Sequence, residues 1–174
     1  GEAPKPAWPA GSAAASATRV VSIAPATLSL TILDVSSSAA ASVVEGETLS
    51  VSIEAENVGA EPAAETVELL DIDGAPADNT SVDLVGGETT QRTLVWATEP
   101  GDAGSGNVTV DSPTASAQTR AVEVLAPQSF GVEILGAATP VEGDTLSVTI
   151  SVENTGDIGD TQTIGLDVGA LGSN

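Results

Sequence analysis

VEGETLSVSI, residues 44–53, recurs as VEGDTLSVTI at residues 141–150. The spacing from Gly46 to Gly143 is 97 residues (143 − 46), and it holds into ENVG at 56–59 and ENTG at 153–156. A match of this length indicates a duplicated structural unit rather than biased composition. The similarity continues more weakly from TVEL at 66–69 to TIGL at 163–166.

A second similarity lies just before each copy. SAQTRAVEVLAP at 116–127 leads into the second copy, and SATRVVSIAP at 16–25 leads into the first. We therefore divide the chain into three parts. Residues 1–26 are a Pro/Ala-rich arm with a possible strand at 18–23, residues 27–126 are a complete unit, and residues 127–174 are the first half of a second unit.

Within the complete unit, apolar and polar residues alternate with a period of two, as in half-buried strands. Turn signals such as Asn57-Val58-Gly59, Asp73-Gly74 and Gly86-Gly87 separate the alternating segments. About seven strands in about 100 residues is typical of a sandwich. We predict an all-β fold, an immunoglobulin- or fibronectin-III-like β-sandwich. The strands are expected around Leu28–Ile32, Leu49–Ala55, 67–69, 82–84, 94–96, 108–110 and 122–124.

Aromatic residues are scarce, so the position of each one is informative. Trp96 alternates with Leu94 on one face of a predicted strand, which predicts that both are core residues. Trp8 lies in a Pro-rich segment, where it is either a docking anchor against another subunit or an exposed aromatic residue. With Arg19, Val20, Val21 and Ile23, which could add a strand to the sheet of a neighbouring subunit, Trp8 forms our candidate assembly anchor.

The composition excludes several classes of function. The chain has no His and no Cys, and it carries 4 Lys+Arg against 25 Asp+Glu, a formal net charge of −21. Catalytic triads, thiolate chemistry, disulfides and zinc sites with the usual ligands are therefore excluded. Nucleic acid is not an expected partner, because too few cations are present to replace phosphate counterions. The sequence contains no run of about 18 apolar residues, so it predicts no membrane-spanning helix.

The acidity also predicts the medium. With 41% hydrophobic residues the chain is too apolar for a solvated acidic tail, so we expect a folded domain with an acidic surface. The negative charges on such a surface repel one another unless salt screens them. At 1 M salt the Debye length falls to roughly 3 Å, so the repulsion is then largely screened. This composition resembles that of proteins from halophilic archaea or their viruses; an ordinary acidic secreted protein is the alternative.

Few residues are candidates for chemistry. The acidic segment around Asp71 and Asp73, with Asp78 and Asp83 nearby, lacks the spacing of a calcium loop, so we interpret it as a turn with surface carboxylates and predict no metal and no cofactor. Asn79, expected in a loop, and Asn107, at the start of a strand, begin N-x-[ST] sequons and are candidate glycosylation sites.

The repeated motifs resemble the CARDB family, the cell-adhesion-related domain of bacteria and archaea. The resemblance rests on Gly46 to Val51, Glu56 to Gly59, Gly87 to Trp96 and Pro100 to Asp102. It implies tandem immunoglobulin-like sandwiches on extracellular surfaces, and it implies no catalytic residues. The second copy departs from the pattern, because it lacks counterparts of Gly87 to Leu125.

Together these observations predict a non-enzymatic, extracellular structural and adhesion subunit of a virion turret or fibre, or of a cell-surface filament, in a high-salt environment. The expected partners are further copies of the chain, capsid or cell-surface proteins, and host glycans, with no membrane insertion. The alternative is an accessory carbohydrate-binding module of a secreted halophilic enzyme, which would require an exposed aromatic platform. Because the chain begins with Gly1, we also expect it to be processed or part of a longer protein.

Overall fold

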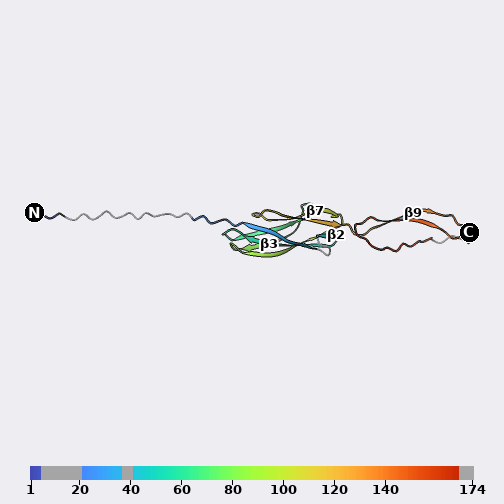
Figure 1. Ribbon diagram of the computed structural model, residues 1–174, viewed down its shortest axis with the longest axis horizontal. Coiled ribbons are helices and arrows are strands. Elements are labelled where there is room, and N and C mark those ends of the chain that lie inside the picture. Colours follow the sequence, from blue (N-terminus) through green and yellow to red (C-terminus); the bar gives the residue numbers. More distant parts are fainter. Residues whose placement is uncertain (5–20, 37–40, 169–174) are drawn as a thin grey trace.

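The computed structural model of the protein describes residues 1–4, 21–36 and 41–168 (Figure 1). Its secondary structure within these ranges is entirely β. The strands are β1 (Leu28–Ser36), β2 (Ser42–Val44), β3 (Thr48–Asn57), β4 (Ala63–Leu70), β5 (Pro76–Leu84), β6 (Thr89–Ala97), β7 (Gly104–Asp111), β8 (Gln118–Leu125), β9 (Phe130–Ala137) and β10 (Val148–Asn154).

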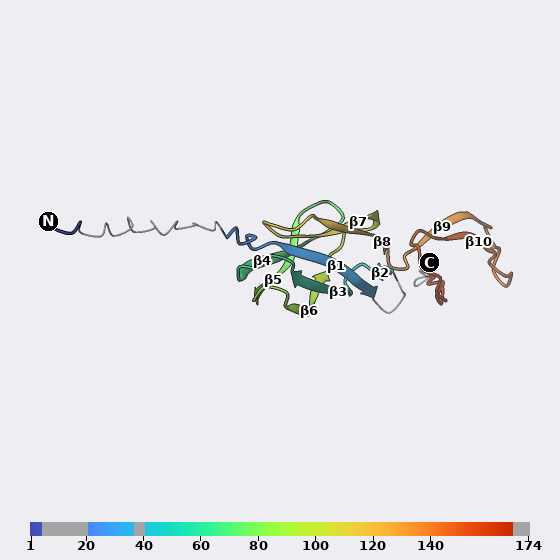
Figure 2. The same cartoon turned by 60° about the vertical axis from the view of Figure 1, so that its left-hand side comes forward.

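The first eight strands form two sheets that face each other (Figure 2). One sheet is three-stranded in the order β1-β3-β6, and the other is five-stranded in the order β2-β8-β7-β4-β5. The pairings are antiparallel except that β2 runs parallel to β8. This is the immunoglobulin- and fibronectin-III-like sandwich that the alternating pattern predicts.

The core is aliphatic and lies between the sheets. Along β3 the side chains of Leu49, Val51 and Ile53 are completely buried, while the residues between them reach the surface. The residues that enclose this core share the same alternation on the other strands; they are Leu28, Leu30, Ile32, Val35, Val43, Ala55, Ala63, Val67, Leu69, Val82, Leu84, Leu94, Trp96, Val108, Val110, Val122 and Val124. None of the described carboxylates is buried, so the negative charge lies on the outside of the sandwich.

The repeated VEGET motif forms a tight turn between β2 and β3. Gly46 has a positive φ of 85°, a conformation that side chains disfavour. The buried Thr98 hydroxyl donates to the carbonyls of Val44 and Glu47 at 3.0 and 2.9 Å. Backbone hydrogen bonds also join Gly46 N to Thr98 O and Thr98 N to Glu47 O. The turn is thereby attached to the end of β6.

Three details differ from the expectations. The sequence did not predict β2, a strand of three residues that is too short to show alternation. Asn79 lies inside β5 rather than in a loop, because Asp78 to Leu84 pair with β4. Residues 21–27 form no strand. The prediction of a strand at 18–23 is therefore wrong for residues 21–23, the part of it that the structure describes.

The second unit is a hairpin of β9 and β10 that lies beyond the end of the sandwich at which β8 ends (Figures 1 and 2). It repeats the β1–β3 pair in register. Leu30 faces Ala55 and Ile32 faces Ile53 in the first unit; Val132 faces Val152 and Ile134 faces Ile150 in the second. A bulge follows Ile32 in β1 and Ile134 in β9. The hairpin side chains Val132, Ile134, Ile150 and Val152 are 39–63% exposed, whereas their first-unit counterparts are buried.

Candidate functional site

The predicted core residues lie between the sheets. Leu94 is completely buried and Trp96 is 5% exposed, both on β6. Only the margin of Trp96 reaches a surface hollow, whose lining includes Asp71, Glu99 and Asp102. A stacking platform needs an open ring face, and Trp96 does not offer one.

The candidate assembly anchor is only partly described. Val21 and Ile23 are 72% and 58% exposed and belong to no strand. Trp8, Arg19 and Val20 lie outside the described residues. Of the anchor residues that the structure describes, Val21 and Ile23, neither belongs to a strand or to the core.

Both sequon asparagines lie on the outer face of the five-stranded sheet. Asn79 is exposed on β5 and Asn107 is exposed on β7. Because residues i and i+2 of a strand share a face, each Asn lies on the same side as its sequon hydroxyl, Ser81 or Thr109.

The acidic segment forms a turn at residues 71–75 and then enters β5, which contains Asp78. The Asp71 carboxylate accepts hydrogen bonds from the backbone N–H groups of Asp73 and Ala75 at 2.9 and 2.8 Å. Asp78 accepts from Val95 N at 2.9 Å and so connects β5 to β6 across the edge of the sandwich. Asp83 is exposed on β5. Within the described residues no group of three or more candidate ligands is arranged for a metal ion.

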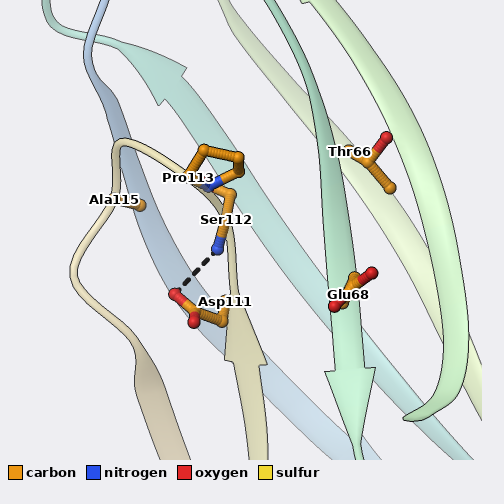
Figure 3. A pocket seen from close by; sticks show the side chains of 6 residues that line it. All are labelled: Thr66, Glu68, Asp111, Ser112, Pro113 and Ala115. Carbon is orange, nitrogen blue, oxygen red and sulfur yellow. Dashed lines mark hydrogen bonds between the residues drawn. The ribbon is translucent and has the colours of Figure 1, made fainter.

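A hollow of about 510 Å³ lies on the outer face of the five-stranded sheet (Figure 3). Its side chains come from β4, from Asp111 at the end of β7 and from the segment that follows β7. Glu68 and Asp111 are direct partners across β4 and β7, so two like charges face each other there. Such pairs destabilise a sheet unless salt screens them. Ser112 is 8% exposed, and its buried Oγ has no hydrogen-bond partner.

Asn57, at the end of β3, makes four side-chain hydrogen bonds. It is completely buried. Its Nδ2 donates to the carbonyls of Glu61 at 2.7 Å and Leu84 at 3.0 Å. Its Oδ1 accepts from Gly59 N at 3.0 Å and from Thr27 N at 3.4 Å. Asn57 therefore ties together its own turn, the segment before β1 and the end of β5.

The second unit repeats this arrangement around Asn154. Its Nδ2 donates to Ile158 O at 2.8 Å, and its Oδ1 accepts from Gly156 N at 3.1 Å and Ser129 N at 3.3 Å. We call residues 57–61 and 154–158 the receiving turns. The sequence showed that these turns are repeated, but not that they bind the segments that precede β1 and β9.

Each receiving turn holds an Ala-Pro segment. Ala24 O accepts from Ala60 N, and Ala126 O accepts from Asp157 N at 3.1 Å. A Cβ placed on Gly59 would lie 2.0 Å from Pro25 O, and one on Gly156 would lie 2.0 Å from Pro127 O. Only glycine fits at both positions, which explains why the turn repeats as Asn-x-Gly.

Within the described residues, no helix has the length and apolar character to cross a membrane.

Comparison with known proteins places these features in a family context. The CARDB family model matches residues 27–120. The CARDB domain of a Pyrococcus furiosus protein, in a crystal structure in complex with di-metal ions, is similar over 61% of this chain and 97% of that domain, with 15% identity and a TM-score of 0.44. Its solution structure gives 60% and 97% coverage, 16% identity and a TM-score of 0.43.

A β-glucosidase from Listeria innocua in complex with glucose is similar over 57% of this chain, with 17% identity and a TM-score of 0.46. The match spans only 16% of that enzyme. A search of the curated proteins found none that matches this chain in sequence.

Proposed function

The chain belongs to the CARDB family, and from that premise we propose that it is a non-enzymatic structural and adhesion subunit of an assembly outside the cell. In this role the sandwich is a spacer, and repeated units carry a distal part of the assembly toward its target. The assembly is a virion turret or fibre, or a cell-surface filament, in a high-salt medium. The observation that carries the proposal is the direct succession of two units with the same receiving turn.

The use of the polar groups supports a structural role. Of the buried polar side chains in the described residues, Asn57 and Thr98 both hold turns through backbone hydrogen bonds, and Ser112 lies at the end of β7. The carboxylates of Asp71 and Asp78 likewise bind backbone N–H groups. Such groups stabilise the folded unit. In an assembly, avidity for a target then arises from many copies of the subunit, each of which makes a weak contact.

The alternative of a carbohydrate-binding module would need an exposed aromatic side chain in the complete unit. The aromatic residue of that unit is Trp96, at 5% exposure. The burial of Trp96 therefore favours the spacer over the binding module.

The partners in this proposal are further copies of the chain, capsid or cell-surface proteins, and host glycans at the distal end. Glycosylation at Asn79 and Asn107 would cover the outer face of the five-stranded sheet.

Surface labelling tests the proposal. Antibodies against residues 27–126 should label intact source cells or virions without permeabilisation, in regular arrays along the projecting structure. Labelling that requires permeabilisation would reject the extracellular location. A second measurement addresses the spacer role. In a Trp8→Phe background, fluorescence of Trp96 in the folded protein should resist quenching by acrylamide, whereas strong quenching that a glycan relieves would favour the binding module.

A further inference from the structure

The two units share one peptide plane. The carbonyl of Leu125 accepts a hydrogen bond from Glu45 N of the first unit at 3.0 Å. The N–H of the next residue, Ala126, donates to Asp157 Oδ2 of the second unit at 2.8 Å. Both groups belong to the peptide bond between Leu125 and Ala126. Because a peptide bond is planar and rigid, the two hydrogen bonds hold that plane from opposite units.

The residues that follow are also held by the second unit. Ala126 O accepts from Asp157 N at 3.1 Å, and Ser129 O accepts from Thr155 N at 2.7 Å. β9 begins one residue later, at Phe130. The segment between β8 and β9 therefore has backbone hydrogen bonds at both of its ends, in contrast to a flexible linker.

The same contact occurs at the start of the first unit. Ala24 O accepts from Ala60 N and Glu61 N, and Val58 N donates to Thr27 O. The segment before β1 thus occupies the first receiving turn in the way that Ala126–Ser129 occupies the second. Each receiving turn fits an Ala-Pro segment that arrives from the chain before it.

The receiving turns read NVGAE at 57–61 and NTGDI at 154–158, and one of the three differences changes what contacts the shared peptide plane. Asp157 supplies a carboxylate to Ala126 N in the second turn, whereas its counterpart in the first turn is Ala60, which has no acceptor. A charge-assisted hydrogen bond is the stronger kind, so this difference bears on how firmly each joint is held.

We propose that the receiving turn is the docking surface through which one unit grips the end of the unit before it, and that Asp157 is the side chain that locks the joint between the two units of this chain. Without this carboxylate, Ala126 N loses its hydrogen bond to the second unit. We then expect the second unit to change its orientation relative to the first by rotation about the backbone at Leu125 and Ala126. The geometry of the joint is independent of where the protein acts; only its use as a stiff spacer rests on the proposed function.

Pulsed electron paramagnetic resonance on the full chain tests this lock. The chain has no cysteine, so Thr93→Cys and Ser151→Cys place one spin label on an exposed position of each unit. The distance distribution should be narrow in the parent and broader in Asp157→Ala. Asp157→Asn should stay close to the parent, because the amide oxygen still accepts a hydrogen bond. The control Asp144→Ala removes the same charge from an exposed turn of the second unit and should change nothing.

Hydrogen exchange provides a readout at the joint itself. Protection of the Ala126 amide should fall about three- to tenfold in Asp157→Ala, from the net strength of one hydrogen bond. Amides of the β9–β10 ladder should keep their protection, which shows that the hairpin remains folded. If they lose it, Asp157→Leu, which keeps a side chain of similar size but has no acceptor for Ala126 N, takes the place of Asp157→Ala.

Two results would overturn the proposal: unchanged Ala126 protection and label distances in Asp157→Ala with the hairpin intact, or equal broadening in Asp144→Ala. Neither result would bear on surface labelling, so failure of the joint and failure of the proposed function remain distinct.

Discussion

Replacing Asn57 by alanine tests whether one buried amide holds the complete unit together. The side chain makes four hydrogen bonds, to the backbone of Thr27, Gly59, Glu61 and Leu84. The bond to Leu84 O is fully buried, and the other three are partly buried. At about 0.5–1.5 kcal/mol for each net hydrogen bond, four bonds set an upper limit of about 6 kcal/mol.

Water can replace the amide at the partly buried partners, so the full loss is not expected there. The Leu84 carbonyl loses a buried donor, which costs about 1–3 kcal/mol by itself. We therefore expect Asn57→Ala to lower the free energy of unfolding by about 2–4 kcal/mol. Asn57→Asp should be at least as harmful, because it loses both donors and places a charge beside two carbonyl oxygens.

The measurement is urea unfolding at constant high salt, followed by Trp96 fluorescence. A Trp8→Phe background leaves Trp96 as the single tryptophan. The matched control is Asn154→Ala, which removes the same residue from the second receiving turn, where the bonds are exposed. It should shift the Trp96 transition by less than about 0.5 kcal/mol. The reasoning is refuted if Asn57→Ala costs less than about 1 kcal/mol, or no more than the control.

Four further outcomes are expected. Trp96→Ala should cost about 3–5 kcal/mol in the same urea experiment, since it opens a cavity between the sheets; a loss below about 1 kcal/mol would mean that the ring does not support the core. Gly59→Ala should destabilise the unit and displace the segment at Pro25, seen as lost protection of the Ala60 amide, whereas Gly136→Ala, whose Cβ would meet nothing within 4 Å, should be neutral. Circular dichroism should lose its β signal when salt is dialysed to low millimolar levels, because 25 acidic residues then repel one another; a fully retained signal would argue against adaptation to high salt. Peptide mass spectrometry of protein from its native source should find glycans at Asn79 and Asn107, and unmodified peptides at both sites would remove glycosylation from the proposal.

Much of the fold could be predicted because its signals are local. Alternation along Leu49–Ile53 requires only that one face of a strand is buried, and the repeat of VEGET and Asn-x-Gly is visible by comparison within the chain. The prediction failed where a signal was short or misleading. β2 has only three residues. Asn79 lies beside Asp78, Thr80 and Ser81, a polar stretch that resembles a loop, but pairing with β4 makes it part of a strand.

The candidate sites were less predictable, because their partners are distant in sequence. Nothing near Asn57 indicates that its amide reaches Leu84, and nothing near Asp157 indicates that its carboxylate reaches Ala126, 31 residues earlier. The repetition of Asn-x-Gly indicated that the turn is structurally important, but it did not show which segment the turn binds.

The sequence by itself determined the all-β architecture, the duplication and the acidic surface, because each follows from residue type and spacing. The tertiary structure alone decided how Pro25 and Pro127 meet Gly59 and Gly156, and how one peptide plane is shared between two units. These contacts depend on where the folded sheets place backbone groups that every residue carries, and backbone groups leave no mark in a sequence.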